Sequence, residues 1–180
     1  MEKKYELTDE TTEVDGKTLH RIRALRDFDD VKADDLGGFI QKEDNLSHDG
    51  YCWVGDDAKV YGYAKVYGDA YIYNIADIYE NACVFGSASV TGETNIFGNA
   101  RIFGDARVFA SAQIYENAQV SGGAFISGKA EIYGNAKIYD NPLISIRAKV
   151  GGNAKIYGDA FIHGNAEIIN DEIITTGEKQ

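Results

Sequence analysis

The fold is decided by a six-residue unit that repeats without interruption, as in Ile96-Phe97-Gly98-Asn99-Ala100-Arg101 followed by Ile102-Phe103-Gly104-Asp105-Ala106-Arg107. Every sixth residue from Val54 to Ile174 is Val or Ile, which gives twenty-one consecutive matches. The residue two positions earlier is nearly always Ala, and the exceptions are Cys52, Thr94, Pro142 and Glu172. Repetition at a fixed short period is typical of a solenoid.

Each position of the unit has a physical role. Val and Ile favour strands and fill a narrow core, and the Ala two residues earlier points to the same side of the strand. The Gly-Asn and Gly-Asp pairs between them tolerate the positive φ angles of a tight corner. A spacing of six does not match the helical period, so the unit is a short strand followed by a turn.

Such short strands cannot bury an apolar face alone, so they must coil and stack. Three units make one triangular turn of 18 residues, and residues 18 apart then lie above one another. The sequence therefore predicts an all-β fold, a single-stranded parallel β-helix of about seven triangular coils.

Residues 1–50 lack the repeat and are predicted to form a small β-rich cap. Residues 11–14 and 17–22 flank Asp15-Gly16, a dipeptide that suits the type I′ turn of a β-hairpin. The cap would cover strand edges at the N-terminal end of the solenoid. The predicted domains are residues 1–50, the cap, and residues 51–180, the β-helix.

The chain is acidic, with a formal net charge of −11. This argues against broad binding to nucleic acid phosphates, which requires clustered cations, and against anionic membranes. The sequence has no apolar run of membrane-spanning length, no apolar signal region near its start and two cysteines, so we expect a cytoplasmic protein. The acidity either serves solubility or imitates a polyanion, in which case the acidic cap run would act: Asp27, Asp29, Asp30, Asp34 and Asp35.

The repeat resembles a known pattern, in which an aliphatic residue is followed four positions later by a small one, as in Val60…Ala64 and Ile156…Ala160. It is similar to the hexapeptide repeat of left-handed β-helix proteins. Several cap segments resemble a family of bacterial and phage hexapeptide-repeat proteins, often labelled acyltransferases: Asp30-Val31-Lys32-Ala33, Leu36-Gly37-Gly38-Phe39-Ile40, Asn45-Leu46-Ser47 and Cys52-Trp53-Val54. The resemblance implies left-handed coiling, a phage or prophage origin and the host cytoplasm as location. Parallel crossovers are generally right-handed, so the handedness rests on the resemblance.

Catalysis is the first function to weigh. The hexapeptide acyltransferases that the chain resembles carry a catalytic His near a subunit interface and commonly a loop between coils. The repeat here leaves no room for such a loop, and His163 is the one candidate general base within it. The similar β-helical carbonic anhydrases need three His on zinc, whereas His20 and His48 lie outside the repeat. We expect no metal and no cofactor, an inert buried Cys52 and an outward Cys83.

Outward aromatic columns are the second feature to weigh, because the residue after each Val or Ile points away from the core. The column of face one consists of Tyr61, Tyr79, Phe97, Tyr115 and Tyr133. The column of face two consists of Tyr67, Phe85, Phe103, Tyr139 and Tyr157, is interrupted by Ser121, and runs beside Lys65, Arg101, Lys137 and Lys155. Face three is mixed.

The aromatic columns have three possible roles. Stacked rings stabilise in-register strands, contiguous apolar patches mark interfaces, and rings beside cations can bind a nucleotide or an acidic partner. Face one, whose column is unbroken, is the better candidate for self-association as a dimer or trimer. Face two is the candidate for a ligand.

Our first hypothesis is a non-catalytic scaffold or binding module, oligomeric and phage- or prophage-derived, that binds a host protein or a small ligand as an inhibitor or counter-defence protein. One alternative is an acyl-coenzyme A-dependent acyltransferase that acts at a subunit interface with His163. The other is an acidic polyanion mimic that blocks a nucleic-acid-binding protein.

Overall fold

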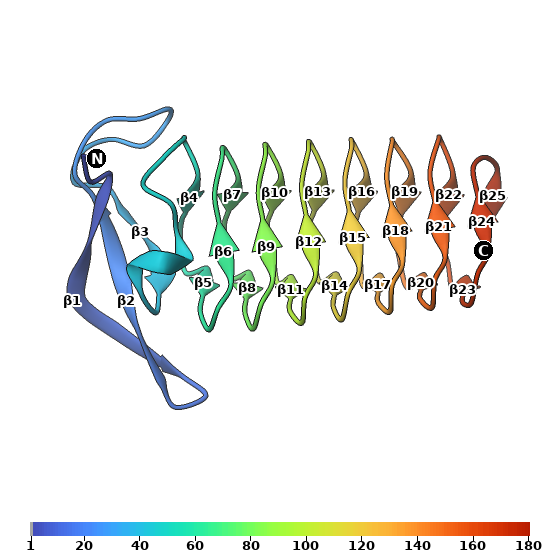
Figure 1. Ribbon diagram of the computed structural model, residues 1–180, viewed down its shortest axis with the longest axis horizontal. Coiled ribbons are helices and arrows are strands. Elements are labelled where there is room, and N and C mark those ends of the chain that lie inside the picture. Colours follow the sequence, from blue (N-terminus) through green and yellow to red (C-terminus); the bar gives the residue numbers. More distant parts are fainter. Residues whose placement is uncertain (1) are drawn as a thin grey trace.

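The computed structural model describes residues 2–180 and confirms the predicted all-β parallel solenoid (Figure 1). Strands of two residues stack coil upon coil into three sheets. The sheet of face one holds β5 (Lys59–Val60), β8 (Asp77–Ile78), β11 (Asn95–Ile96), β14 (Gln113–Ile114), β17 (Glu131–Ile132), β20 (Lys149–Val150) and β23 (Glu167–Ile168).

The other two faces are built in the same way. The sheet of face two holds β6 (Lys65–Val66), β9 (Cys83–Val84), β12 (Arg101–Ile102), β15 (Gln119–Val120), β18 (Lys137–Ile138), β21 (Lys155–Ile156) and β24 (Ile173–Ile174). The sheet of face three holds β4 (Trp53–Val54), β7 (Tyr71–Ile72), β10 (Ser89–Val90), β13 (Arg107–Val108), β16 (Phe125–Ile126), β19 (Leu143–Ile144), β22 (Phe161–Ile162) and β25 (Glu178–Lys179).

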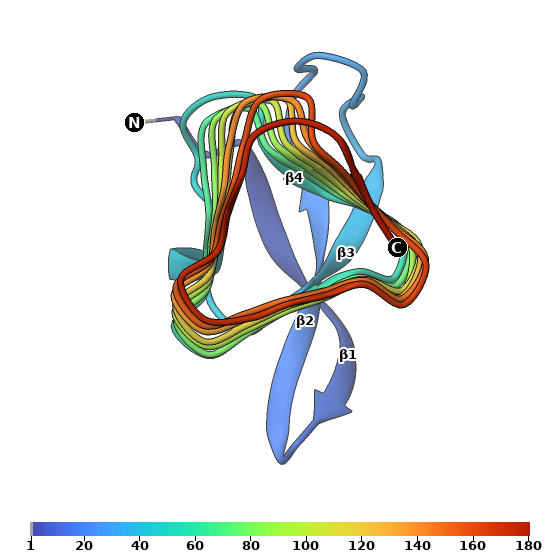
Figure 2. The same ribbon diagram turned by 90° about the vertical axis from the view of Figure 1, so that its right-hand side faces the viewer.

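The coils are left-handed, as the family resemblance implied. Figure 2 looks along the axis from the C-terminal end, so the chain advances toward the viewer. It turns clockwise from face three through face one to face two while it does so, which is the left-handed sense.

The core consists of the Val and Ile of the repeat and the Ala two residues before each. Ile96, Ile114 and Ala100 are fully buried, as are nearly all of their equivalents. Each coil bonds to the next through backbone amides one turn apart, as when the Phe97 N–H donates to the Ile114 carbonyl at 3.0 Å. The short side chain of Ala allows the chain to bend close to the axis.

Every corner uses one left-handed residue, the first of its turn. The φ angle is positive at every sixth residue from Asp56 to Asn170, for example 69° at Gly98 and 58° at Glu116. A Cβ atom added to Gly98 would come within 2.7 Å of the Glu116 backbone nitrogen in the next coil. Gly is therefore favoured there for its φ angle and for the close approach of the coils.

The predicted hairpin is present and is longer than expected. β1 (Tyr5–Val14) and β2 (Lys17–Ala24) are joined at Asp15 and Gly16, whose φ angles of 48° and 72° fit the predicted type I′ turn. β3 (Leu36–Ile40) pairs antiparallel with β2 and parallel with β5. The hairpin therefore continues the sheet of face one.

The first coil is assembled from the segment after β3. Ile40 pairs with Val60 on face one, and Leu46, which follows the 3-10 helix η1 (Glu43–Asn45), forms a bridge with Val66 on face two. These partners are 20 residues apart, whereas Val54 and Ile72 on face three are 18 apart, so the two extra residues lie between Leu46 and Val54, in the corner that holds His48. No helix in residues 2–180 is long and apolar enough to cross a membrane.

Candidate functional site

The face-one ladder is continuous, as the spacing of 18 predicts. Rings from Tyr61 to Tyr133 stack in sequence with centroids 5.0 to 5.5 Å apart and planes within 9° of parallel. Both ends are closed. The hairpin covers Tyr61, which is 5% exposed and packs with Leu19 and Phe39. The Tyr133 ring occupies the space that a side chain at Gly151 would need.

The two lysines at outward strand positions of face one form ion pairs with carboxylates of the same face. Lys59 lies 3.6 Å from Asp77, and Lys149 lies 3.0 Å from Glu131, measured between nitrogen and oxygen atoms. Burial raises the pKa of Tyr115 to about 12, with a further contribution from Glu131, so this rung stays neutral at physiological pH. In the corner beside this face, side chains of successive coils form a chain of hydrogen bonds at 2.9 to 3.1 Å, in which each Asn amide donates to the next side chain. The residues of this amide ladder are Asn99, Asn117, Asn135, Asn153 and Asp171. Both lysines of face one and the amides of its corner therefore find partners within the chain, while the buried Asp77 Oδ1 keeps an ion-pair contact but has no hydrogen-bond partner among residues 2–180.

The face-two ladder is broken at its centre. Tyr67, Phe85 and Phe103 stack at 4.8 and 5.0 Å, and Tyr139 and Tyr157 stack at 4.7 Å. Ser121 lies between the two stacks, as the sequence predicts. Phe103 and Tyr139 therefore each keep one ring face without an aromatic neighbour in the described chain.

The cations of face two point outward from its strands, beside the aromatic column. Lys65, Arg101, Lys137 and Lys155 are exposed, and none forms an ion pair with a carboxylate of residues 2–180. No outward strand position of this face is acidic; the others are Cys83, Gln119 and Ile173. The Arg101 guanidinium lies 5.2 Å from the Phe85 ring centroid and 5.9 Å from that of Phe103, within cation–π range.

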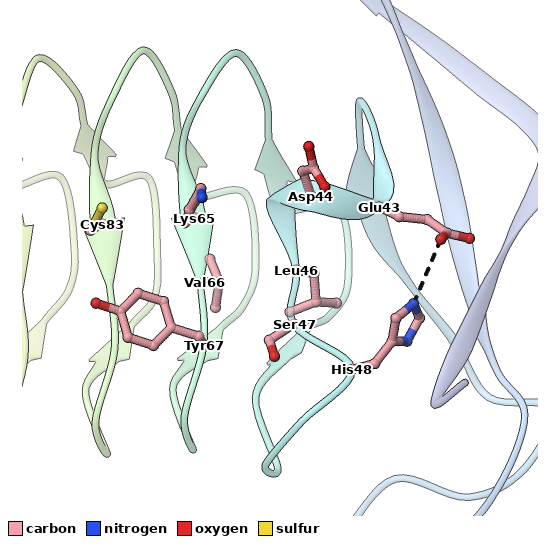
Figure 3. Close-up of a pocket in the computed structure, with 9 residues that line it drawn as sticks. All are labelled: Glu43, Asp44, Leu46, Ser47, His48, Lys65, Val66, Tyr67 and Cys83. Carbon is pink, nitrogen blue, oxygen red and sulfur yellow. Dashed lines mark ion pairs between the residues drawn. The ribbon is translucent and has the colours of Figure 1, made fainter. Parts of the chain in front are cut away.

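A groove of about 630 Å³ opens where the cap meets face two. Its walls come from the cap and from the first two coils: Glu43, Asp44, Leu46, Ser47, His48, Lys65, Val66, Tyr67 and Cys83. Ser47 follows Leu46 just as Tyr67 follows Val66, so the ladder lacks a ring here too. Figure 3 shows Tyr67 and Lys65 on the solenoid side of the groove and His48 on the cap side. The free face of Tyr67 is therefore available at one end of face two.

His48 is held in place by contacts with other residues of the cap. Its ring stacks on Tyr5 at 4.3 Å, and its Nδ1 accepts the Lys4 N–H at 3.2 Å. Burial lowers the pKa of His48 despite Glu43, whose carboxylate lies 3.9 Å from Nε2 (Figure 3). Nε2 is buried and has no hydrogen-bond partner among residues 2–180. A neutral His48 is thus the form that the fold accommodates.

Cys52 is buried, as expected, but it is not isolated. The Lys4 ammonium is also fully buried and lies 3.4 Å from the Cys52 Sγ, donating to the carbonyls of Cys52 at 2.8 Å and Gly50 at 3.2 Å. Burial raises the pKa of the Cys52 thiol and lowers the pKa of Lys4. The pair fastens the start of β1 to the first coil.

The remaining candidate residues do not form a reactive cluster in the described chain. His163 lies against Phe161, with ring centroids 4.2 Å apart, and its Nε2 is 2.5 Å from a Glu178 carboxylate oxygen. Cys83 is half-buried at the rim of the groove. Within residues 2–180, no three His, Cys, Asp or Glu side chains are grouped so that they could hold a metal ion.

Some carboxylates of the acidic cap run accept hydrogen bonds from nearby residues of the fold. Asp27 accepts the Ala33 N–H at 2.9 Å, and Asp35 accepts the Lys32 N–H at 2.7 Å. Asp29 accepts a hydrogen bond from the Tyr71 hydroxyl. These three carboxylates therefore have structural partners.

Sequence reasoning located both aromatic columns but missed the groove. Ser47, His48 and Glu43 belong to the cap, outside the uninterrupted repeat. A signal was present in Leu46, an aliphatic residue eight positions before Val54 that is followed by a small polar residue in the ladder position.

Comparison with known protein families agrees with this architecture. A family model described as YdcK Beta solenoid repeat matches residues 100–116, which pass once around the prism through all three faces. No curated protein matches the chain. The matched stretch is similar to a β-solenoid repeat, and this similarity concerns the scaffold.

Proposed function

We propose that the protein is a non-catalytic β-solenoid module that binds an acidic partner along face two. One observation carries the proposal: four exposed cations that pair with no carboxylate of residues 2–180 line an aromatic column on a chain of net charge −11. Cations of face one are neutralised within the chain, whereas those of face two are free to neutralise a partner. Arg and aromatic side chains are also enriched in protein interfaces.

The groove supplies a recess at one end of this surface. Binding energy concentrates where an anchoring side chain enters a water-excluding pocket. The free face of Tyr67 and the Lys65 ammonium would receive such an anchor. The partner is an acidic host protein in the bacterial cytoplasm, and the protein itself is phage- or prophage-encoded; both statements belong to this proposal.

A differential capture experiment tests it. The wild type, a face-two variant with Arg101→Glu and Lys137→Glu, and a face-one variant with Lys59→Glu and Lys149→Glu are immobilised and exposed to bacterial lysate. We expect acidic proteins that are retained by the wild type and the face-one variant and lost by the face-two variant. Equal retention by all three proteins contradicts the proposal.

We propose self-association through face one as a second property. Its five rings form an unbroken column in which Tyr61 is buried and the other four are half-buried, and a second copy would bury the remaining ring edges. Light scattering should give a dimer or trimer for the wild type and a monomer for the variant with Tyr79→Asp and Tyr115→Asp. A monomeric wild type contradicts this part alone.

An acyltransferase that uses His163 remains the alternative function. The contact between His163 and Glu178 would orient the ring of a general base. Calorimetry with acetyl-coenzyme A separates the two functions. Binding that is abolished by His163→Ala would replace the scaffold proposal.

A further inference from the structure

The break in the face-two ladder has the dimensions of one missing ring. Phe103 still stacks on Phe85, and Tyr139 still stacks on Tyr157, so the rings on both sides of Ser121 keep the ladder orientation. Two coil spacings of about 4.8 Å separate positions 103 and 139, which places these rings roughly 9.6 Å apart. A planar group between them would lie at the spacing that the ladder's own rings adopt.

The floor and the open side of this slot are made of small residues. Ser121 donates a hydrogen bond through its hydroxyl to the Ile138 carbonyl at 3.4 Å. Gly122 and Gly123 follow at the corner, and Gly123 is exposed. Gly122 and Gly123 place no side chain in the path of a ring that enters from this corner, where the Asn141 Oδ1 of the next coil would lie 2.6 Å from a Cβ atom on Gly123.

The polar surroundings select the charge of the occupant. Arg101 and Lys137 precede Ile102 and Ile138 on the two neighbouring coils, and Gln119 lies between them on the strand side of the slot. Asp105 and Asp140 follow Phe103 and Tyr139 at the corner side, and the Asp140 carboxylate accepts the Gly158 N–H of the following coil at 3.2 Å. An anionic group attached to the ring would thus be attracted toward the strand side and repelled from the corner side.

A second gap in the repeat lacks these features. Thr91 separates Tyr73 from Phe109 on face three. Phe109 packs edge-on against Phe125 at 71°, and Tyr73 stacks on Tyr71 of its own coil, so neither ring continues a ladder. A missing ring by itself therefore does not create a slot.

We propose that the Ser121 slot binds a small planar aromatic anion, with its ring between Phe103 and Tyr139 and its anionic group between Arg101 and Lys137. This inference rests on the proposed function of face two and names the ligand class that its centre recognises. Stacking on two rings tolerates different ring systems because each presents a π face. The anionic group and its position supply the selectivity.

Calorimetry with adenosine 5′-monophosphate tests the slot, with adenosine and inorganic phosphate as separate probes for the ring and the charge. Ser121→Tyr completes the ladder and fills the slot, while Thr91→Tyr places the same side chain at the other gap. We expect Ser121→Tyr to weaken nucleotide binding by at least about tenfold, because both stacking contacts are lost. Thr91→Tyr, which adds the same side chain outside the slot, should leave binding unchanged.

Ser121→Tyr should also raise the thermal unfolding midpoint, since it adds ring contacts, so weaker binding cannot be attributed to unfolding. Undetectable nucleotide binding at millimolar concentration overturns the slot. Binding that survives Ser121→Tyr but is lost with Arg101→Glu and Lys137→Glu also overturns it, and leaves face two as a binding surface. Equal affinity for adenosine and adenosine 5′-monophosphate overturns the proposed contact of the anionic group with Arg101 and Lys137.

Discussion

Faces one and two are built from the same six-residue unit and differ in what their outward residues leave unsatisfied. On face one the rings stack without a gap, the ladder is closed by the hairpin and by Gly151, and both lysines have carboxylate partners. On face two the ladder is broken at Ser121, open at Tyr67 and lined with unpaired cations. The repeat fixes the backbone but not the outward residues, so one face can stabilise the fold while another binds a partner.

The largest expected effect on stability comes from replacing a phenylalanine of either ladder, and the two faces can be compared through Phe97 and Phe103. Phe97→Ala on face one removes a ring stacked on both sides, whereas Phe103→Ala on face two removes one stacked on one side. We expect the free energy of unfolding to fall by about 3 kcal/mol for Phe97→Ala and by about 2 kcal/mol for Phe103→Ala. Urea denaturation measures both, and an equal loss would contradict the distinction between the faces.

The next effect concerns the corners beside the two faces. Asn117 donates to Asn135 and accepts from Asn99, while the side chain of Asn141, in the same turn position beside face two, has no side-chain partner in residues 2–180. Asn117→Ala should lower the free energy of unfolding by about 1 kcal/mol, and Asn141→Ala by less than about half of that. Urea denaturation of both variants measures these two losses. A larger loss for Asn141→Ala would show that the amide ladder does not stabilise face one.

A smaller effect is expected from charge reversal. Lys149→Glu replaces an ion pair with Glu131 by a repulsion and should lower the free energy of unfolding by less than Asn117→Ala does, because water and salt screen the pair. Lys137→Glu breaks no pair, so stability should stay unchanged while retention of an acidic partner falls. Salt titration of the unfolding midpoint provides the control, since added salt should reduce the deficit of Lys149→Glu. A deficit that salt leaves unchanged would exclude an electrostatic cause.

The difference between regular and singular features explains what the sequence could reveal. The Val, Ile and Ala positions repeat in every coil, so periodicity alone predicted the core and both aromatic columns. The burial of Lys4 against Cys52, the cover of the hairpin over Tyr61 and the groove at Ser47 each occur once. They depend on the 20-residue first coil and on how the cap folds back, and neither has a periodic signal. The amide chain from Asn99 to Asp171 shows a third case, because the sequence repeats the residues but does not specify their bonds.

The smallest effect is a pH dependence that belongs to the groove and not to face one. Burial lowers the pKa of His48 in the folded protein, so the unfolded chain takes up the proton first as the pH falls. Stability should therefore decline as the pH drops below the ordinary His pKa of about 6.5. Asp77 on face one changes stability in the opposite direction as the pH falls. Burial raises its pKa, so the folded state holds the proton more tightly than the unfolded chain does.

Thermal unfolding between pH 7 and pH 5 measures this decline. His48→Asn retains an oxygen that can accept the Lys4 N–H and removes the titrating ring, so its midpoint should change less with pH than that of the wild type. If His48→Asn falls as steeply as the wild type, the groove is not the acid-sensitive part of the fold, and its cap wall would not depend on a neutral imidazole.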